Sequence, residues 1–125
     1  MRVRLETEAK LEIQERIQTG NLELVWSYIL DFENSANPFE ERKQAISQWR
    51  EHAHADIEES DDVLKVARCI ISKGVRAKDA LHIACAVIGG CDCFLTTDDE
   101  LIRKMAGFEG VRVINPAEFI IGELA

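Results

Sequence analysis

The stretch KDALHIACAVIGGCDCFLTTDDELIRK, residues 78–104, predicts a helix, a glycine turn, a short strand and a second helix in close succession. Apolar residues recur with helical spacing over 78–88, and Gly89 and Gly90 end that helix. CFLTT, residues 93–97, is a short apolar run of the kind that forms a buried strand. A helix joined to a strand by a tight turn is typical of an α/β protein.

The rest of the chain continues this alternation. We expect helices over 3–18, 39–51 (opened by Pro38), 61–73 (closed by Gly74) and 98–105, helical turns over 28–34 and from Pro116 onward, and strands over 22–27, 55–57 and 111–114. Alternating helices and strands predict an α/β fold with a largely parallel sheet. No repeat, linker or low-complexity segment interrupts the pattern, so we expect a single domain over residues 1–125.

The composition fits a globular protein. A chain of 125 residues with 46% hydrophobic residues can bury one core, and no apolar run is long enough to span a bilayer. The opening MRVRLETEAK lacks the apolar segment of a signal peptide, so we expect a cytoplasmic protein without membrane association. The net charge of −8 argues against tight non-specific binding of nucleic acid, but it also provides carboxylates that can gather around a cation.

Cysteine and histidine do not show the spacing of a zinc site. His52 and His54 lie in a polar stretch, and we expect both to be solvated. The four cysteines lack a C-x-x-C pair, and we expect them to be small buried hydrophobic residues: Cys69, Cys85, Cys91 and Cys93.

Acidic residues recur where strands end and helices begin. Ligands bind at the carboxyl ends of strands in open parallel sheets, so acids at these positions are expected to converge. Converging carboxylates repel one another unless a cation joins them, and Mg²⁺ or Mn²⁺ suits an all-oxygen ligand set. The acids concerned are Asp31, Glu33, Asp79, Asp98, Asp99 and Glu100.

Each acid also has a simpler interpretation. Asp79 and Asp98 each stand at the head of a predicted helix, where aspartate is a favoured cap. Glu33 can be a solvated surface acid. We expect Asp79 to cap its helix and to take part in chemistry as well.

Three segments together resemble the PIN domain family, and more narrowly the toxin-like (VapC-type) PIN proteins of prokaryotic toxin–antitoxin systems. They are LELVWSYILDFENSANPFEERKQAI (22–46), the stretch 78–104 quoted above, and VRVINPAEFI (111–120). D-A-L-H-I-A followed by a strand that ends in T-x-D carries most of the resemblance, which covers nearly the whole chain. It implies a PIN-like three-layer α/β/α fold with a mostly parallel sheet.

The resemblance also implies a Mg²⁺- or Mn²⁺-dependent endoribonuclease, the toxin of a toxin–antitoxin pair. The family's metal-binding acids fall on Glu33, Asp79 and Asp98, with Asp99 as a possible auxiliary acid. Thr96 matches the hydroxyl residue of T-x-D, whose role would be to hold a carboxylate or water in place. The implied partners are an RNA substrate, a cognate antitoxin and a second copy of the chain in a homodimer.

His82 matches a position of a PIN subfamily and lies three residues from Asp79, on the same helix face. We interpret His82 as a structural residue. Lys73, Arg76 and Lys78 precede Asp79 and can meet RNA phosphates or form a solvated loop.

The chain departs from the family at its N-terminus. MRVRLETEAKLEIQERI, residues 1–17, aligns with the helix that follows the family's first strand and first aspartate. That strand is the central one of the family's sheet, so without it two neighbouring strands lack backbone partners. We expect an N-terminally truncated PIN-like domain. In that case the native chain is longer; the alternatives are a strand over Met1–Leu5 or a second copy that fills the gap.

Two functions therefore remain open. One is a metal-dependent endoribonuclease, whose activity the missing aspartate weakens. The other is a catalytically inactive PIN-like module that binds protein or RNA, and both the missing aspartate and the net charge of −8 favour it. A phospho-acceptor receiver domain is excluded because Asn115 and Pro116 follow the last strand, where such a domain needs a lysine.

Overall fold

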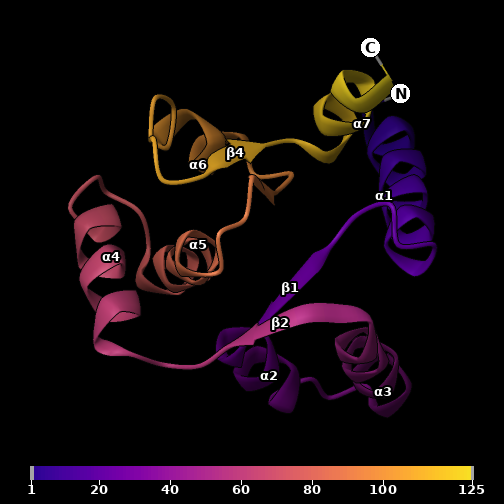
Figure 1. Ribbon diagram of the computed structural model, residues 1–125, viewed down its shortest axis with the longest axis horizontal. Helices are drawn as coiled ribbons and strands as arrows, with labels where there is room; N and C mark the ends of the chain where they lie inside the picture. The colour runs from indigo at the N-terminus through magenta and orange to yellow at the C-terminus, as the bar shows by residue number, and fades with distance from the viewer. Residues whose placement is uncertain (1, 125) are drawn as a thin grey trace. The chain divides into compact units, whose positions relative to one another are not determined.

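The computed structural model describes residues 2–124 and confirms the α/β class, with short parallel strands between helices (Figure 1). Its elements run in the order α1 (Arg2–Gln18), β1 (Leu24–Ser27), α2 (Tyr28–Ser35), α3 (Glu40–Trp49), the 3-10 turn η1 (Arg50–His52), β2 (Ala53–Ile57), α4 (Asp61–Ile71), α5 (Ala77–Ile88), β3 (Cys93–Leu95), α6 (Asp99–Lys104), β4 (Arg112–Ile114) and α7 (Pro116–Leu124).

The chain forms two compact units, which are described separately. The first unit consists of Met1–Leu22 and Asp92–Ala125 and carries α1, β3, α6, β4 and α7. The second unit is Glu23–Cys91 and carries β1, α2, α3, β2, α4 and α5. Whether 1–125 behaves as a single domain stays a prediction.

In the second unit β1 and β2 pair in parallel and lie side by side, as Figure 1 shows. Helix α5 contacts β1, and α4 packs along α5. Both helices bury residues at helical spacing, and five of these residues have no exposed surface: Val63, Ile70, Ala80, Ile83 and Ala84. Gly89 follows α5, and a Cβ atom there would lie 2.9 Å from Cγ1 of Val25 on β1. Glycine therefore lets the end of α5 approach the sheet.

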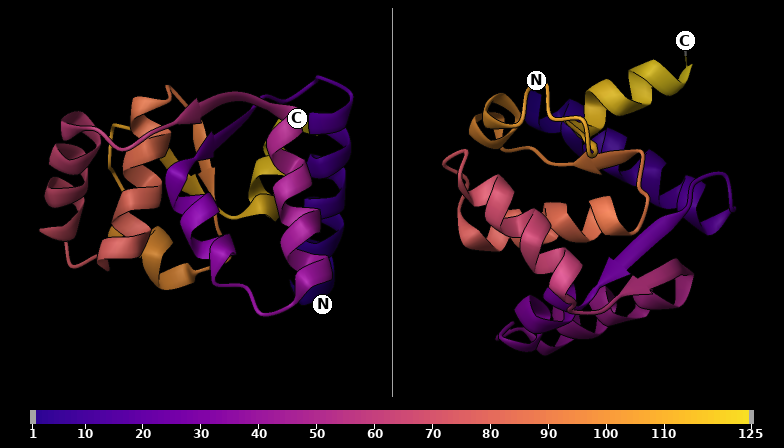
Figure 2. Two further views of the ribbon diagram at one scale, coloured as in Figure 1. Left: turned by 90° about the horizontal axis from the view of Figure 1, so that it is seen from below. Right: turned by 60° about the vertical axis from the view of Figure 1, so that its left-hand side comes forward.

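In the first unit β3 and β4 form a second parallel pair, and α1 lies against α7 (Figure 2). Asn115 connects α1 to the start of α7. Its Nδ2 donates a 2.6 Å hydrogen bond to Oε2 of the buried Glu6 on α1, and its Oδ1 accepts from the backbone N–H of Ala117. Asn115 thus supplies a side-chain acceptor at the start of α7, and Pro116 occupies the first helical position, which suits a residue without an N–H.

The strands of the described residues lie in two separate two-stranded sheets, β1–β2 and β3–β4, where the sequence suggested one sheet. Local sequence signals identify strands but not their partners, which explains the difference. The segment from Pro116 is a nine-residue helix and not a single turn.

A strand over Met1–Leu5 is wrong for residues 2–5, which are helical, while Met1 lies outside the described residues. Ion pairs at i,i+4 spacing favour the helix: Arg4 Nε lies 3.2 Å from Glu8 Oε1, and Arg2 Nε lies 3.5 Å from Glu6 Oε1. Over residues 2–124, no helix combines the length and apolar character needed to cross a membrane.

Candidate acidic site

Glu33 lies in the last turn of α2 and faces α5. Its Oε1 contacts Nε2 of His82, which is 49 residues away in the chain. The His82 side chain is 16% exposed and that of Glu33 is 37% exposed, so the pair lies at the edge of the core with one side open to solvent. Glu33 is therefore not the freely solvated acid of the simpler interpretation.

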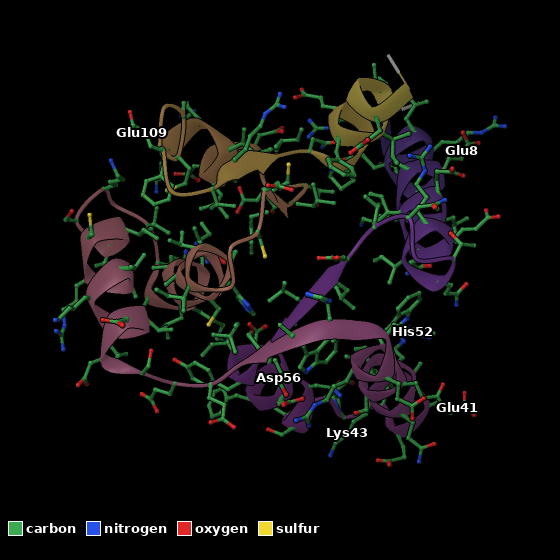
Figure 3. The ribbon with its side chains drawn as sticks, in the orientation of Figure 1. Glu8, Glu41, Lys43, His52, Asp56 and Glu109 are labelled. Atoms are coloured by element: carbon green, nitrogen blue, oxygen red, sulfur yellow. The ribbon has the colours of Figure 1, made fainter. Side chains whose placement is uncertain are left out.

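The residues around Glu33 hold α2 from other directions. Asp31 accepts a 2.9 Å hydrogen bond from Nε1 of the buried Trp26 on β1. Asn34, also buried, donates from Nδ2 to the backbone oxygen of Lys43 on α3. Lys43 is labelled in Figure 3. Because α2 is tied to both β1 and α3, the backbone of Glu33 is fixed.

Arg50 joins this region to β2. Its Nη2 lies 2.6 Å from Oδ2 of Asp56, which is labelled in Figure 3, and its Nη1 lies 3.5 Å from Oδ2 of Asp31. Asp31 therefore has a structural role, as a shared acceptor for Trp26 and Arg50. Asp31 and Glu33 therefore have different partners, although they are only two residues apart in the chain.

Asp79 lies in the first turn of α5, but it does not cap the helix. The helix begins at Ala77, and Arg76 occupies the N-cap position without a side-chain capping bond. Asp79 is the third helical residue, and our expectation that it caps α5 is wrong because two further residues join the helix before it. Its carboxylate is still favoured there by the positive end of the helix dipole. Within residues 2–124 this carboxylate has no hydrogen-bond or ion-pair partner, and the residue is half-buried.

Asp98 does cap its helix. Its Oδ1 accepts hydrogen bonds from the backbone N–H groups of Glu100, at 3.0 Å, and Leu101, at 3.1 Å. The hydroxyl of Thr96 in turn accepts from the backbone N–H of Asp98 at 3.1 Å. Thr96 therefore fixes the backbone of Asp98. Of the two carboxylate oxygens of Asp98, Oδ1 caps the helix, and Oδ2 has no hydrogen-bond partner among the described residues.

Asp99 is paired with Arg2 of α1. The two guanidinium nitrogens Nη1 and Nη2 of Arg2 each lie 2.6 Å from one carboxylate oxygen of Asp99. These hydrogen bonds lower the pKa of the Asp99 carboxyl below its ordinary value. With both oxygens bound by Arg2, Asp99 is not free to serve as an auxiliary acid in this arrangement.

The donor set fits Mg²⁺ or Mn²⁺ in its chemistry, because Glu33, Asp79 and Asp98 offer only oxygen. The described residues do not, however, group into a complete metal site. Glu33 and Asp79 belong to the second unit and Asp98 to the first, and within residues 2–124 no three histidine, cysteine, aspartate or glutamate side chains are grouped so as to hold a metal ion.

The sequence did not identify the partner of Glu33. We interpreted His82 as a structural residue. The signal in the sequence that linked it to the acids was its position three residues after Asp79, on the same helix face. The histidines His52 and His54 are exposed as expected. Of the four cysteines, Cys85 is buried and Cys69 is exposed, so burial of all four is wrong.

No protein-family model matches the chain, and no curated protein or solved structure is detectably similar to it.

Proposed function

We propose that this chain is a PIN-like domain of the metal-dependent endoribonuclease type, in which Glu33, Asp79 and Asp98 bind a divalent cation. The observation that carries the proposal is Asp79. A half-buried carboxylate in the first turn of a twelve-residue helix, with no partner within residues 2–124, is available for a cation. Bound Mg²⁺ or Mn²⁺ would activate a water and stabilise the phosphoryl transition state.

The sheet arrangement supports the PIN-like part of the proposal. The resemblance implies a sheet in which the absent strand is central and has a neighbouring strand on each side. Loss of such a strand divides a sheet, and the strands of the described residues form two separate parallel pairs, β1–β2 and β3–β4. Each pair is short, and two strands alone make a marginal sheet, so each pair would gain stability from a further strand of its own.

The chain's own residues have distinct roles in this proposal. Thr96 holds the backbone of Asp98, and His82 contacts Glu33. Arg76 and Lys78 are exposed at the start of α5 and would meet RNA phosphates. A cognate antitoxin, a homodimer and a cytoplasmic location belong to the same proposal.

A catalytically inactive PIN-like module is the second candidate, because protein contacts already use three of the four acids. Glu33 contacts His82, Asp98 caps α6, and Asp99 pairs with Arg2. In such a module these acids would stabilise the fold, and the surface would bind a protein or RNA without cleaving it.

Calorimetric titration of the full chain with Mn²⁺ separates the two candidates. In the first, the chain binds Mn²⁺, Asp79→Asn weakens binding about tenfold or more with little change in thermal stability, and RNA is cleaved only with metal present. The matched control is Asp61→Asn, which removes an exposed first-turn acid from α4. Absence of Mn²⁺ binding, or equal loss in Asp61→Asn and Asp79→Asn, would refute the enzyme and favour the module.

A further inference from the structure

Strand β3 of the first unit pairs with β4 along one edge, and no strand pairs with its other edge among residues 2–124. Two backbone hydrogen bonds show which groups of the β3 segment face β4. The N–H of Arg112 donates to the carbonyl oxygen of Asp92 at 3.2 Å, and the N–H of Thr96 donates to the carbonyl oxygen of Ile114 at 3.0 Å. Asp92 and Thr96 therefore direct these groups toward β4.

The backbone groups of β3 that face away from β4 belong to Cys93 and Leu95. Successive residues of a strand direct their N–H and C=O groups to opposite edges, so Phe94, midway between Asp92 and Thr96, also faces β4. The N–H and C=O groups of Cys93 and Leu95 make no hydrogen bond within residues 2–124. The unpaired edge thus carries one donor and one acceptor on each side of Phe94.

This edge also lacks the features that keep strand edges from pairing. Natural proteins protect an exposed edge with charged side chains or with proline. Two other strands carry exposed polar or charged side chains, His54 and Asp56 on β2 and Arg112 on β4. The sequence of β3, Cys-Phe-Leu, contains neither a charge nor a proline, and all three residues are partly exposed. The edge of β3 is therefore open to a further strand.

We infer that β3 pairs antiparallel with β3 of a second copy of the chain, around a two-fold axis at Phe94. In this register Cys93 of each copy lies opposite Leu95 of the other, and the two residues exchange both of their backbone hydrogen bonds. All four free groups of each copy are then satisfied, because a two-fold interface brings the same segment together with itself. The product is a four-stranded sheet in the order β4–β3–β3–β4, which is more stable than two strands alone.

The side chains suit this register. Phe94 lies opposite Phe94 of the second copy, and cross-strand aromatic pairs are favourable. Like charges directly opposite one another would destabilise the pair. Asp92, the acid next to β3 in the chain, instead lies opposite the uncharged Thr96 of the second copy. The inference specifies the contact surface of the homodimer in the proposed function, and it does not depend on metal binding.

Sedimentation of the full chain over a range of concentrations tests the pairing. We expect the wild-type chain to approach twice its mass of 14.1 kDa as the concentration rises. Leu95→Pro removes an N–H from the unpaired edge and leaves the bonds to β4 in place, so this variant should stay monomeric. The matched control is Val113→Pro, which removes the corresponding N–H from the outer edge of β4 and should still dimerise.

Amide hydrogen exchange of the wild-type chain, followed by NMR, gives a second readout that needs no variant. The N–H groups of Cys93 and Leu95 should exchange slowly in the dimer and lose this protection on dilution to the monomer. The N–H of Val113, on the outer edge of β4, should exchange at a rate that does not depend on concentration.

Three results would overturn the inference. The first is a chain that stays monomeric at every concentration. The second is a dimer in which the N–H groups of Cys93 and Leu95 exchange freely, because such a dimer uses another surface. The third is a dimer that Leu95→Pro leaves intact. Each of these results leaves the Mn²⁺ titration of the wild-type chain as a separate test, so the pairing and the metal site can fail independently.

Discussion

Asp98 has two possible roles, and one pair of substitutions separates them. The carboxylate caps α6 by accepting from the backbone N–H groups of Glu100 and Leu101, and in the proposed function it also binds a cation. Asp98→Ala removes both the cap and the ligand. Asp98→Asn keeps a side-chain oxygen that can accept the same two bonds, but it removes the negative charge. The two variants should therefore agree in metal binding and differ in stability.

The size of the stability effect follows from the two capping bonds. Replacing an aspartate N-cap by alanine costs about 1 kcal/mol, while asparagine caps nearly as well as aspartate. Loss of the charge in Asp98→Asn weakens the interaction with the helix dipole by a few tenths of a kcal/mol. That loss is partly offset, because Asp99 and Glu100 already place two negative charges in the first turn of α6. We expect Asp98→Ala to cost about 1 kcal/mol, and Asp98→Asn less than half of that.

Urea unfolding followed by circular dichroism measures this difference, and a thermal melt gives a second value. A loss of about 1 kcal/mol corresponds to a fall in Tm of about 4 °C for a chain of this size. Calorimetry with Mn²⁺ on the same samples should show weakened binding in both variants. Full metal affinity in Asp98→Asn would show that Asp98 is a cap alone. Equal destabilisation by Asn and Ala would refute the capping argument, because asparagine retains the acceptor.

Two further predictions concern packing. Gly89→Ala should destabilise the chain, because the added Cβ would lie 2.9 Å from a side-chain atom of Val25. The control is Gly122→Ala in α7, where the added Cβ meets no atom within 4 Å. This change should be neutral or should stabilise the chain by up to about 1 kcal/mol. Ile70→Ala, at a position with no exposed surface, should cost about 2–5 kcal/mol, while the same change at its neighbour Ile71, 41% exposed, should cost far less. Urea unfolding checks both pairs, and similar losses within either pair would contradict the packing described above.

The order and type of the elements could be predicted from the sequence because their signals are local. The helices over 2–18, 61–71 and 77–88 follow apolar periodicity, and Gly20, Gly74 and Gly90, all with positive φ, stand after their ends. The capping role of Asp98 was among the alternatives for the same reason, since a cap and the N–H groups it satisfies lie within three residues. The predicted cap at Asp79 failed because the helix begins earlier: Arg76 occupies the N-cap position, three residues before Asp79.

Contacts between distant residues could not be predicted in this way. The pair formed by Glu33 and His82 spans 49 residues, and the buried pair formed by Glu6 and Asn115 spans 109. Arg2 binding to Asp99 changes that acid from a free carboxylate to an ion pair, although nothing near Asp99 in the chain indicates it.

The sequence by itself therefore determined the α/β class, the succession of helices and strands, and which acids stand at their ends. Only the tertiary structure decided how the strands pair, in two separate parallel sheets, and which of the acids are already bound by the protein. The physical reason is the distance along the chain over which each kind of interaction acts. Propensity, capping and glycine turns act over a few residues, whereas strand pairing and the neutralisation of a carboxylate depend on groups that only folding brings together.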